Sequence, residues 1–283
     1  MLMVKAYAKI NIGLNIVSRD ENDFYHYLDM INLPIELHDR IELEVMPHGY
    51  DTIVTCDEPS LPVDESNLAY KAEHAMREAF KYDANLRIHI HKIVPIGAGL
   101  AGGSADAAAV IKGINSLLRL KASEEQLMEI GAKVGSDVPF CLMNKGARVT
   151  SKGEVINPIK VKGKYFVLIV VPKQRLSTKE VYKKFDEVSS PDKADIELLI
   201  SSLATNNVDE VLKAEGNMLE YPALQLCPEI AKVKELLTKE VGNAMLTGSG
   251  SAVFALSHDH HLVKKVYQKL EGKGYKIFLT ETK

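Results

Sequence analysis

The sequence predicts an α+β protein of two domains, and three observations carry that prediction. Segments with strand and helix patterns occur in clusters rather than in strict β-α-β alternation. The length of 283 residues exceeds the usual size of a single domain. A short apolar run at 165–171 follows Gly163 and indicates the start of a second core. We therefore predict domains at 1–163 and 164–283.

The first domain is expected to begin with strands. Apolar and polar residues alternate over 10–16, which predicts a half-buried strand with Lys9, Asn11 and Asn15 on one face. This face is predicted to form a polar wall. Further strands are expected at 28–37, 40–46, 52–56 and 86–92, with a helix at 66–80.

Helices and strands then alternate in groups. Helical spacing predicts a helix over 107–120, and Ser123 with Gln126 predicts a capping box for a second helix that ends at Gly135. Strands are expected at 147–150, 155–159 and 165–171. In the second domain we expect helices at 178–185, 195–203, 228–238 and 261–270, and strands at 244–247, 252–257 and 275–280.

Composition excludes several classes of partner. A net charge of -3 with scattered lysine and arginine gives no basic patch for nucleic acid, so a small-molecule partner is expected. The start of the chain does not resemble a signal peptide, and the run at 165–171 is far shorter than the roughly 20 residues that cross a bilayer. We therefore expect no membrane partner and a cytoplasmic location. The three scattered cysteines are expected to be reduced and mostly buried thiols.

A glycine-rich segment carries the chemistry. It runs Pro95-Ile96-Gly97-Ala98-Gly99-Leu100-Ala101-Gly102-Gly103-Ser104-Ala105 and continues into an alanine-rich helix. Small residues let an anion approach the backbone, and a helix N-terminus offers N–H groups and about half a positive charge. The segment therefore predicts a phosphate-binding turn, with the hydroxyl of Ser104 as a further donor or a candidate magnesium ligand.

Other interpretations of this segment have less support. Residues 97–102 fit the G-x-G-x-x-G fingerprint of dinucleotide-binding folds, but Pro95 interrupts the preceding strand and no acidic residue ends a second strand about 20 residues later. A Walker ending and the motifs of protein kinases are missing from the sequence. A loop that only packs a helix on a sheet is disfavoured by the number of glycines.

In this loop, and in the order of the other motifs given below, the chain resembles the galactokinase, homoserine kinase, mevalonate kinase and phosphomevalonate kinase (GHMP) superfamily. The resemblance spans nearly the whole chain. Its motifs are the loop itself, Ala8-Lys9-Ile10-Asn11, Tyr25-His26, Asn67-Leu68, Lys92, Gly135-Ser136-Asp137-Val138-Pro139, Ser177-Thr178 and Thr247-Gly248-Ser249-Gly250. It implies a two-lobed fold, with an N-terminal lobe like ribosomal protein S5 domain 2 and a C-terminal ferredoxin-like lobe. Within the superfamily, the chain is most similar to the kinases that phosphorylate a cytidine-diphosphate-linked methylerythritol in the non-mevalonate isoprenoid route.

The resemblance also implies cofactors and site residues. ATP and Mg²⁺ are the expected cofactors, and Lys9 and Asp137 the catalytic pair. The implied ATP contacts are Asn67, Lys92, Pro95, Gly97, Ala98, Gly99, Leu100, Ala101, Gly102, Gly103, Ser104 and Ala105. The implied substrate contacts are Asn11, Tyr25, His26, Asp137, Thr178, Gly248 and Ser249.

Departures from the family pattern keep alternatives open. Phe24 and Tyr27 flank the cytidine motif, Ala105 replaces a second serine of the loop, and Lys152 replaces an arginine. Another small-alcohol kinase and a nucleotide-binding homologue without catalysis both remain alternatives, and the chain is expected to be a monomer or a homodimer. For its histidines we expect no zinc site: those at 258–261 are expected to be solvated, and those at 89 and 91 to lack a carboxylate partner.

Overall fold

The computed structural model describes residues 1–20, 25–47, 51–188 and 190–283. Its internal contacts divide the chain into two compact units. The first unit comprises Met1–Ala8, Leu37–Ile96 and Ala101–Asn144, and the second comprises Lys9–Glu36, Gly97–Leu100 and Lys145–Lys283. Because each unit is built from several chain segments, the boundary between residues 163 and 164, which assumed one continuous segment per domain, stays a prediction.

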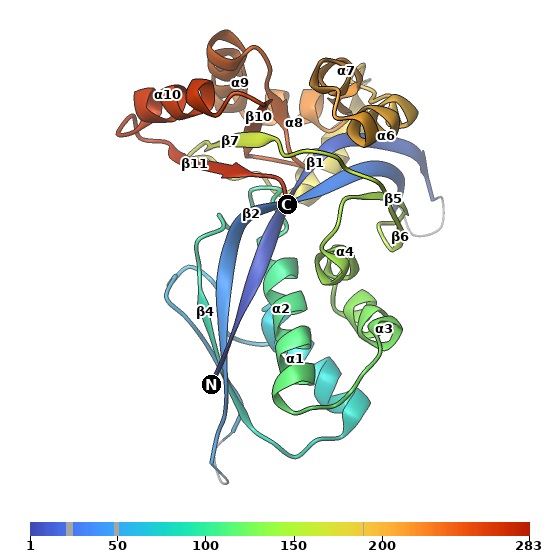
Figure 1. Cartoon of the computed structure of the whole chain (residues 1–283), viewed down its shortest axis with the longest axis vertical. Coiled ribbons are helices and arrows are strands. Elements are labelled where there is room, and N and C mark those ends of the chain that lie inside the picture. The colour runs from blue at the N-terminus through green and yellow to red at the C-terminus, as the bar shows by residue number, and fades with distance from the viewer. Residues whose placement is uncertain (21–24, 48–50, 189) are drawn as a thin grey trace. The chain divides into compact units, whose positions relative to one another are not determined.

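The first unit packs helices on one face of a sheet (Figure 1). Strands β1 (Leu2–Arg19) and β2 (His26–Val45) pass from one unit into the other, whereas β3 (Ile53–Cys56) and β4 (Leu86–His91) belong to the first. β4 pairs parallel with β3 and antiparallel with the end of β2. The covering helices are α1 (Leu68–Phe80), α2 (Gly102–Leu117), α3 (Glu124–Val134) and α4 (Val138–Met143).

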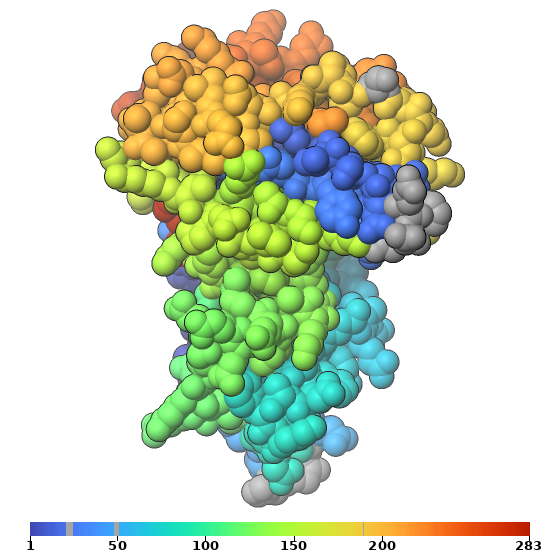
Figure 2. All heavy atoms as spheres, turned by 90° about the vertical axis from the view of Figure 1, so that its right-hand side faces the viewer, coloured from blue at the N-terminus to red at the C-terminus, as the bar shows by residue number. Residues whose placement is uncertain are grey.

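The second unit contains a sheet with the strand order β11-β7-β10-β9, in which all pairs are antiparallel. Helices α9 and α10 lie on this sheet (Figure 1). In space-filling form, the yellow-green segment after β6 lies beside the orange-yellow helices α6 and α7 (Figure 2), and the Lys162 amide donates to the Leu203 carbonyl. The elements are β5 (Ala147–Ser151), β6 (Val155–Pro158), β7 (Phe166–Val171), α5 (Thr178–Glu187), α6 (Ile196–Thr205), α7 (Val208–Ala214), β8 (Gly216–Asn217), α8 (Glu220–Leu226), α9 (Pro228–Val241), β9 (Met245–Leu246), β10 (Val253–Ser257), α10 (His260–Leu270) and β11 (Lys276–Glu281).

The predicted α+β class is confirmed, and most predicted elements are present. Ser123 forms the capping box with Gln126, and Gly135 follows the last residue of α3. The three cysteines are free, with Cys141 and Cys227 buried. Within the described residues, every helix is too short or too polar to cross a lipid bilayer.

Two predictions about elements were wrong, and three short helices were not predicted. Two predicted strands are the single strand β2, because the polar residue Asp39 between them is fully buried by its own partners rather than exposed in a turn. Helix α2 begins at Gly102 rather than Ala107, so the last glycines of the loop already belong to the helix. The short helices α4, α7 and α8 were not predicted, because too few turns are present to show a helical period.

Candidate functional site

The first turn of α2, in the first unit, has no capping side chain. Its N-cap residue, Ala101, has a left-handed φ of 54° and no side chain that could cap the helix. Gly103 is exposed, and a Cβ added there would meet only Leu68 Cδ1, at 3.6 Å. Ser104 is partly exposed in the same turn. The N–H groups of this first turn lack a capping side chain, so the geometry fits a phosphate group.

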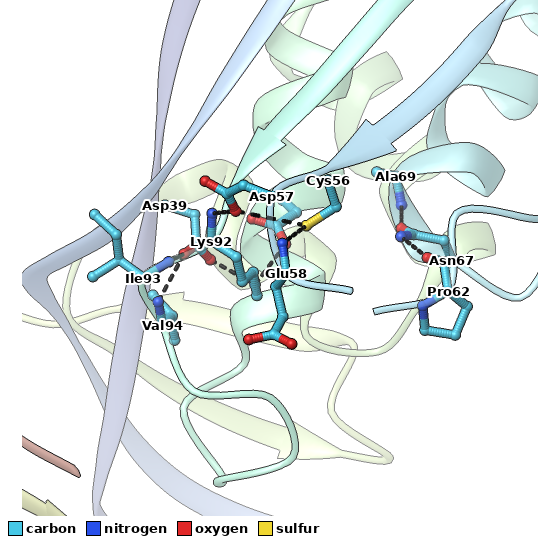
Figure 3. A network of polar contacts seen from close by, with 11 residues as sticks. Asp39, Cys56, Asp57, Glu58, Pro62, Asn67, Ala69, Lys92, Ile93 and Val94 are labelled. Atoms are coloured by element: carbon cyan, nitrogen blue, oxygen red, sulfur yellow. Dashed lines mark hydrogen bonds and ion pairs between the residues drawn. The ribbon is translucent and has the colours of Figure 1, made fainter. Parts of the chain in front are cut away.

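A buried ion network lies beside this helix start. Lys92 Nζ is 2.6 Å from Asp39 Oδ2 and 2.7 Å from Asp106 Oδ2, and all three side chains are almost fully buried. Asp39 Oδ1 also accepts hydrogen bonds from the amides of Ile93 and Val94, at 2.5 and 2.7 Å (Figure 3). The network therefore ties β2, the residues just before Pro95 and the first turns of α2 together.

In this network, the single ammonium group of Lys92 forms ion pairs with the carboxylates of both Asp39 and Asp106. Burial, together with the charge of Asp39, raises the pKa of Asp106 to about 7, against the attraction of Lys92. Burial would lower the pKa of Lys92, but the two carboxylates outweigh burial and raise it. Asp106 Oδ1 is buried without a hydrogen-bond partner. Lys92 therefore stays charged, while burial favours the protonated form of Asp106.

Two further predicted residues lie in the first unit. Asn67 caps α1, since its Oδ1 accepts from the Ala69 amide at 2.8 Å while its Nδ2 donates to the Pro62 carbonyl at 2.6 Å (Figure 3). Asp137 is partly exposed at the N-terminus of α4, and its side chain makes no capping hydrogen bond there. The carboxylate is therefore not used to cap α4.

The first glycines of the loop lie in the second unit, against the hairpin turn between β9 and β10. Gly99 has a φ of 80°, and a Cβ there would lie 2.0 Å from the Thr247 carbonyl oxygen. The Ala252 amide donates to the Ala98 carbonyl at 3.2 Å, and the Lys9 amide donates to the Leu100 carbonyl at 3.1 Å. The strands predicted at 244–247 and 252–257 pair as an antiparallel hairpin, which holds this half of the loop by backbone contacts.

The polar face of β1, which was predicted to form a polar wall, is buried. Lys9 is only 5% exposed, and its Nζ donates to Asn11 Oδ1 at 2.5 Å. Asn11 Nδ2 donates to Asn32 Oδ1 at 2.6 Å, which turns the Asn11 carbonyl oxygen toward Lys9. Asn15 is hydrogen-bonded to both backbone groups of Ala194. The prediction of a half-buried strand was wrong, because the second unit covers both faces of β1 between Lys9 and Asn15.

The hairpin turn shares polar contacts with its surroundings in the second unit. The hydroxyl groups of Thr178 and Ser249 are 2.9 Å apart. The Gly248 carbonyl accepts from Asn217 Nδ2 at 2.8 Å, and Thr247 Oγ1 accepts from the Asn11 amide at 3.1 Å. The turn after β9 therefore lies together with five predicted residues of this unit, namely Lys9, Asn11, Thr178, Gly248 and Ser249.

The predicted cytidine motif lies against α5. His26 Nε2 is 2.7 Å from Asp186 Oδ1, and the His26 ring lies 4.9 Å from the ring of Tyr182 and 5.9 Å from that of Phe185. Sequence reasoning did not assign these three residues, although their spacing of three and four positions places them on one helix face. Tyr25 is 63% exposed.

Lys152 and Tyr27, two residues that depart from the family pattern, lie beside Tyr25. Lys152 Nζ lies 5.5 Å from the centre of the Tyr25 ring and 5.6 Å from that of Tyr27. The lysine that replaces the usual arginine is thus placed to make cation–π contacts with both rings. Phe24, the third departure of this segment, lies outside the described residues.

Comparison with known proteins decides the family. The model of the GHMP kinases N terminal domain matches residues 67–145, and that of the GHMP kinases C terminal domain matches residues 199–276. A 4-diphosphocytidyl-2-C-methyl-D-erythritol kinase from Clostridium botulinum (strain Eklund 17B / Type B) is 37% identical over 99% of both chains. The chain belongs to the GHMP kinase family. It is a small-molecule kinase, and the resemblance seen in its motifs is confirmed.

Further GHMP kinases extend the similarity. The enzyme of the same name from Caldicellulosiruptor bescii is 38% identical over 99% of this chain and 98% of its own. A crystal structure of 4-(cytidine 5'-diphospho)-2C-methyl-D-erythritol kinase superimposes with a TM-score of 0.83 at 28% identity, covering 99% of each chain. A homoserine kinase from Cytophaga hutchinsonii shares the fold alone, with a TM-score of 0.74 at 17% identity over 99% of this chain and 94% of its own.

Proposed function

We propose that this kinase transfers the γ-phosphoryl group of MgATP to the 2-hydroxyl of 4-diphosphocytidyl-2-C-methyl-D-erythritol. The observation that carries the choice of acceptor is the match of 37% identity over 99% of both chains to an enzyme named for that substrate. The exposed Tyr25 ring and the oriented His26 support it, because a nucleobase needs a stacking surface and an edge contact.

We propose that the triphosphate binds along residues 95–105. The support is the uncapped start of α2 and the exposed Gly103, where the backbone is accessible to a phosphate oxygen. Bound magnesium would neutralise phosphate charge, with the Ser104 hydroxyl as one proposed ligand. Asn67 and Lys92 are the proposed nucleoside contacts. Their polar atoms already have protein partners, so they would shape that pocket more than donate freely to the base.

Asp137 and Lys9 are the proposed catalytic residues. Phosphoryl transfer proceeds through a loose transition state, so positioning of the hydroxyl and neutralisation of charge dominate. The Asp137 carboxylate would accept the proton of the acceptor hydroxyl as the oxygen attacks phosphorus. The Lys9 ammonium is fixed by Asn11, and that contact leaves two of its three N–H groups for the transferring phosphoryl group.

We propose that Asn11, Thr178, Gly248 and Ser249 hold the sugar-alcohol part of the acceptor. The support is the hydroxyl and amide network around the turn after β9, in which groups of β1, α5 and β8 are hydrogen-bonded to Thr247, Gly248 and Ser249 of the turn. Polar groups held in fixed positions orient a hydroxylated substrate with little loss of side-chain entropy.

The assignment can be tested by recording ATP consumption with and without the cytidine-linked substrate. We expect strong stimulation by that compound, little by other sugar alcohols, and a loss of about 10²-fold or more in turnover for Asp137→Asn. Stimulation by a different alcohol alone would contradict the acceptor. Turnover close to that of the wild type in Asp137→Asn would contradict the catalytic role.

A further inference from the structure

A cluster of metal-ligating side chains lies on the first unit's sheet, apart from the residues proposed for phosphoryl transfer. Asp57, His89 and His91 each offer one ligand atom, and these atoms all lie within 4.8 Å of one another. The expectation that the two histidines lack a carboxylate partner was wrong. Asp57 follows the neighbouring strand β3, so its distance in sequence concealed its proximity.

The sheet register explains why the cluster forms. Thr55 and Cys56 of β3 pair with His89 and Ile90 of β4, so Asp57 comes next to His91. Because side chains alternate along a strand, both histidines point to the face opposite the fully buried Ile90. Packing of that buried face fixes both strands, so the strand register alone brings the three ligand side chains to one face of the sheet.

Each of the three side chains also has an outer partner that orients it. The Lys92 amide donates to Asp57 Oδ1 at 2.8 Å (Figure 3), and Asp57 Oδ2 lies 3.7 Å from His91 Nδ1. Glu42 Oε2 lies 3.5 Å from His91 Nε2, the ring nitrogen on the far side from Asp57. Thr55 Oγ1 lies 2.8 Å from His89 Nδ1.

This arrangement is that of a metal site with its supporting partners. Metal-bound histidines usually donate their second N–H to a carboxylate or another oxygen, and metal-bound carboxylates are themselves hydrogen-bonded. Two imidazoles and one carboxylate suit zinc and neighbouring first-row metals, whereas magnesium and calcium prefer oxygen ligands alone. We propose that Asp57, His89 and His91 bind one divalent first-row transition metal such as Zn²⁺, cross-linking β3 to β4 and leaving a coordination position for water.

The proposal is tested by calorimetric titration of the full chain with ZnCl₂, using protein made without a histidine tag, dialysed against a chelator and free of ATP. We expect one Zn²⁺ per chain and at least about tenfold weaker binding in His91→Gln and in Asp57→Asn. The matched control is His74→Gln, which changes an exposed histidine of α1 in the same unit and should leave binding unchanged.

Thermal unfolding supplies an independent measurement that does not depend on activity. A ligand that binds only the folded chain raises Tm, so Zn²⁺ should raise Tm in the wild type and in His74→Gln but not in His89→Gln/His91→Gln. Magnesium at the same concentration should give no such difference between the variants. The proposal is overturned if the wild type binds no Zn²⁺, or if the variants of the cluster bind it as tightly as the control.

Discussion

The ion network around Asp39 yields the sharpest prediction about stability and ATP binding. Asp39 is fully buried, and its carboxylate accepts from the Ile93 and Val94 amides and pairs with Lys92. Asp39→Ala removes all three acceptor contacts at once. The two amides are then left without their partner directly before the proposed phosphate loop.

The size of the effect follows from these contacts. A buried donor that loses its acceptor costs about 1–3 kcal/mol, and breaking a buried ion pair costs about 3–5 kcal/mol when the other charge is left alone. Lys92 keeps Asp106 as a partner, so the ion-pair share should be smaller. We expect Asp39→Ala to lower the free energy of unfolding by about 4 kcal/mol, and Asp39→Asn, which keeps an acceptor for the amides, by about 2 kcal/mol.

Urea unfolding measures the stability change, and steady-state kinetics of the folded variants measure its effect on the loop. For Asp39→Asn we expect KM for ATP to rise by a larger factor than kcat falls, because the loop is displaced while the catalytic groups are kept. Asp51→Ala, an exposed carboxylate in the same unit, is the control and should stay within about 0.5 kcal/mol of the wild type. Equal stability of Asp39→Ala and the control would refute the reasoning.

Three other predictions concern the second unit and the loop. Burial raises the pKa of Glu215 to about 8, above its ordinary value of 4.5. Between these two pH values the Glu215 carboxyl keeps its proton in the folded chain but loses it in the unfolded chain. The free energy of unfolding therefore falls as pH rises from about 4.5 to about 8. Glu215→Gln should therefore raise Tm at about pH 8.5 more than at about pH 5, and an equal rise at both would contradict this. Asp186→Asn should raise KM for the acceptor about tenfold through loss of its contact with His26, with KM for ATP unchanged as the kinetic control; a parallel rise in both would indicate general damage. Gly99→Ala should lower Tm, whereas Gly103→Ala should raise KM for ATP without lowering Tm; the reverse pattern would show that the roles of the two glycines are misassigned.

Local patterns were sufficient for much of the fold and for the motifs of the site. The capping box at Ser123 and the buried strand β7 depend on neighbouring residues, which a sequence displays directly. The second unit's cover over β1 depends on residues far along the chain, such as Ala194 at the Asn15 amide. Alternation therefore predicted which side chains share a face but not that both faces are buried.

Polar residues inside apolar patterns were the main source of error. Asp39 suggested a break between two strands, because a carboxylate without visible partners is expected at the surface. Its partners are Lys92 and two amides more than fifty positions away, as the distances in sequence of 53, 54 and 55 show. Asp57 escaped notice for the same reason, since the parallel pairing of β3 with β4 brings it to His91.

The glycines of the loop are present for two different physical reasons, which the sequence alone did not distinguish. Gly99 is required by the protein itself, because its positive φ and the Thr247 carbonyl oxygen leave no room for a Cβ. The fold makes no such demand at Gly103, where an added Cβ would make one ordinary contact and alanine would favour the helix. Because glycine at this position lowers helix stability and packing does not require it, we infer that a bound group must come close to the backbone of Gly103. Gly103 lies in the first turn of a helix without a capping side chain, which supports the proposal that a phosphate group approaches it.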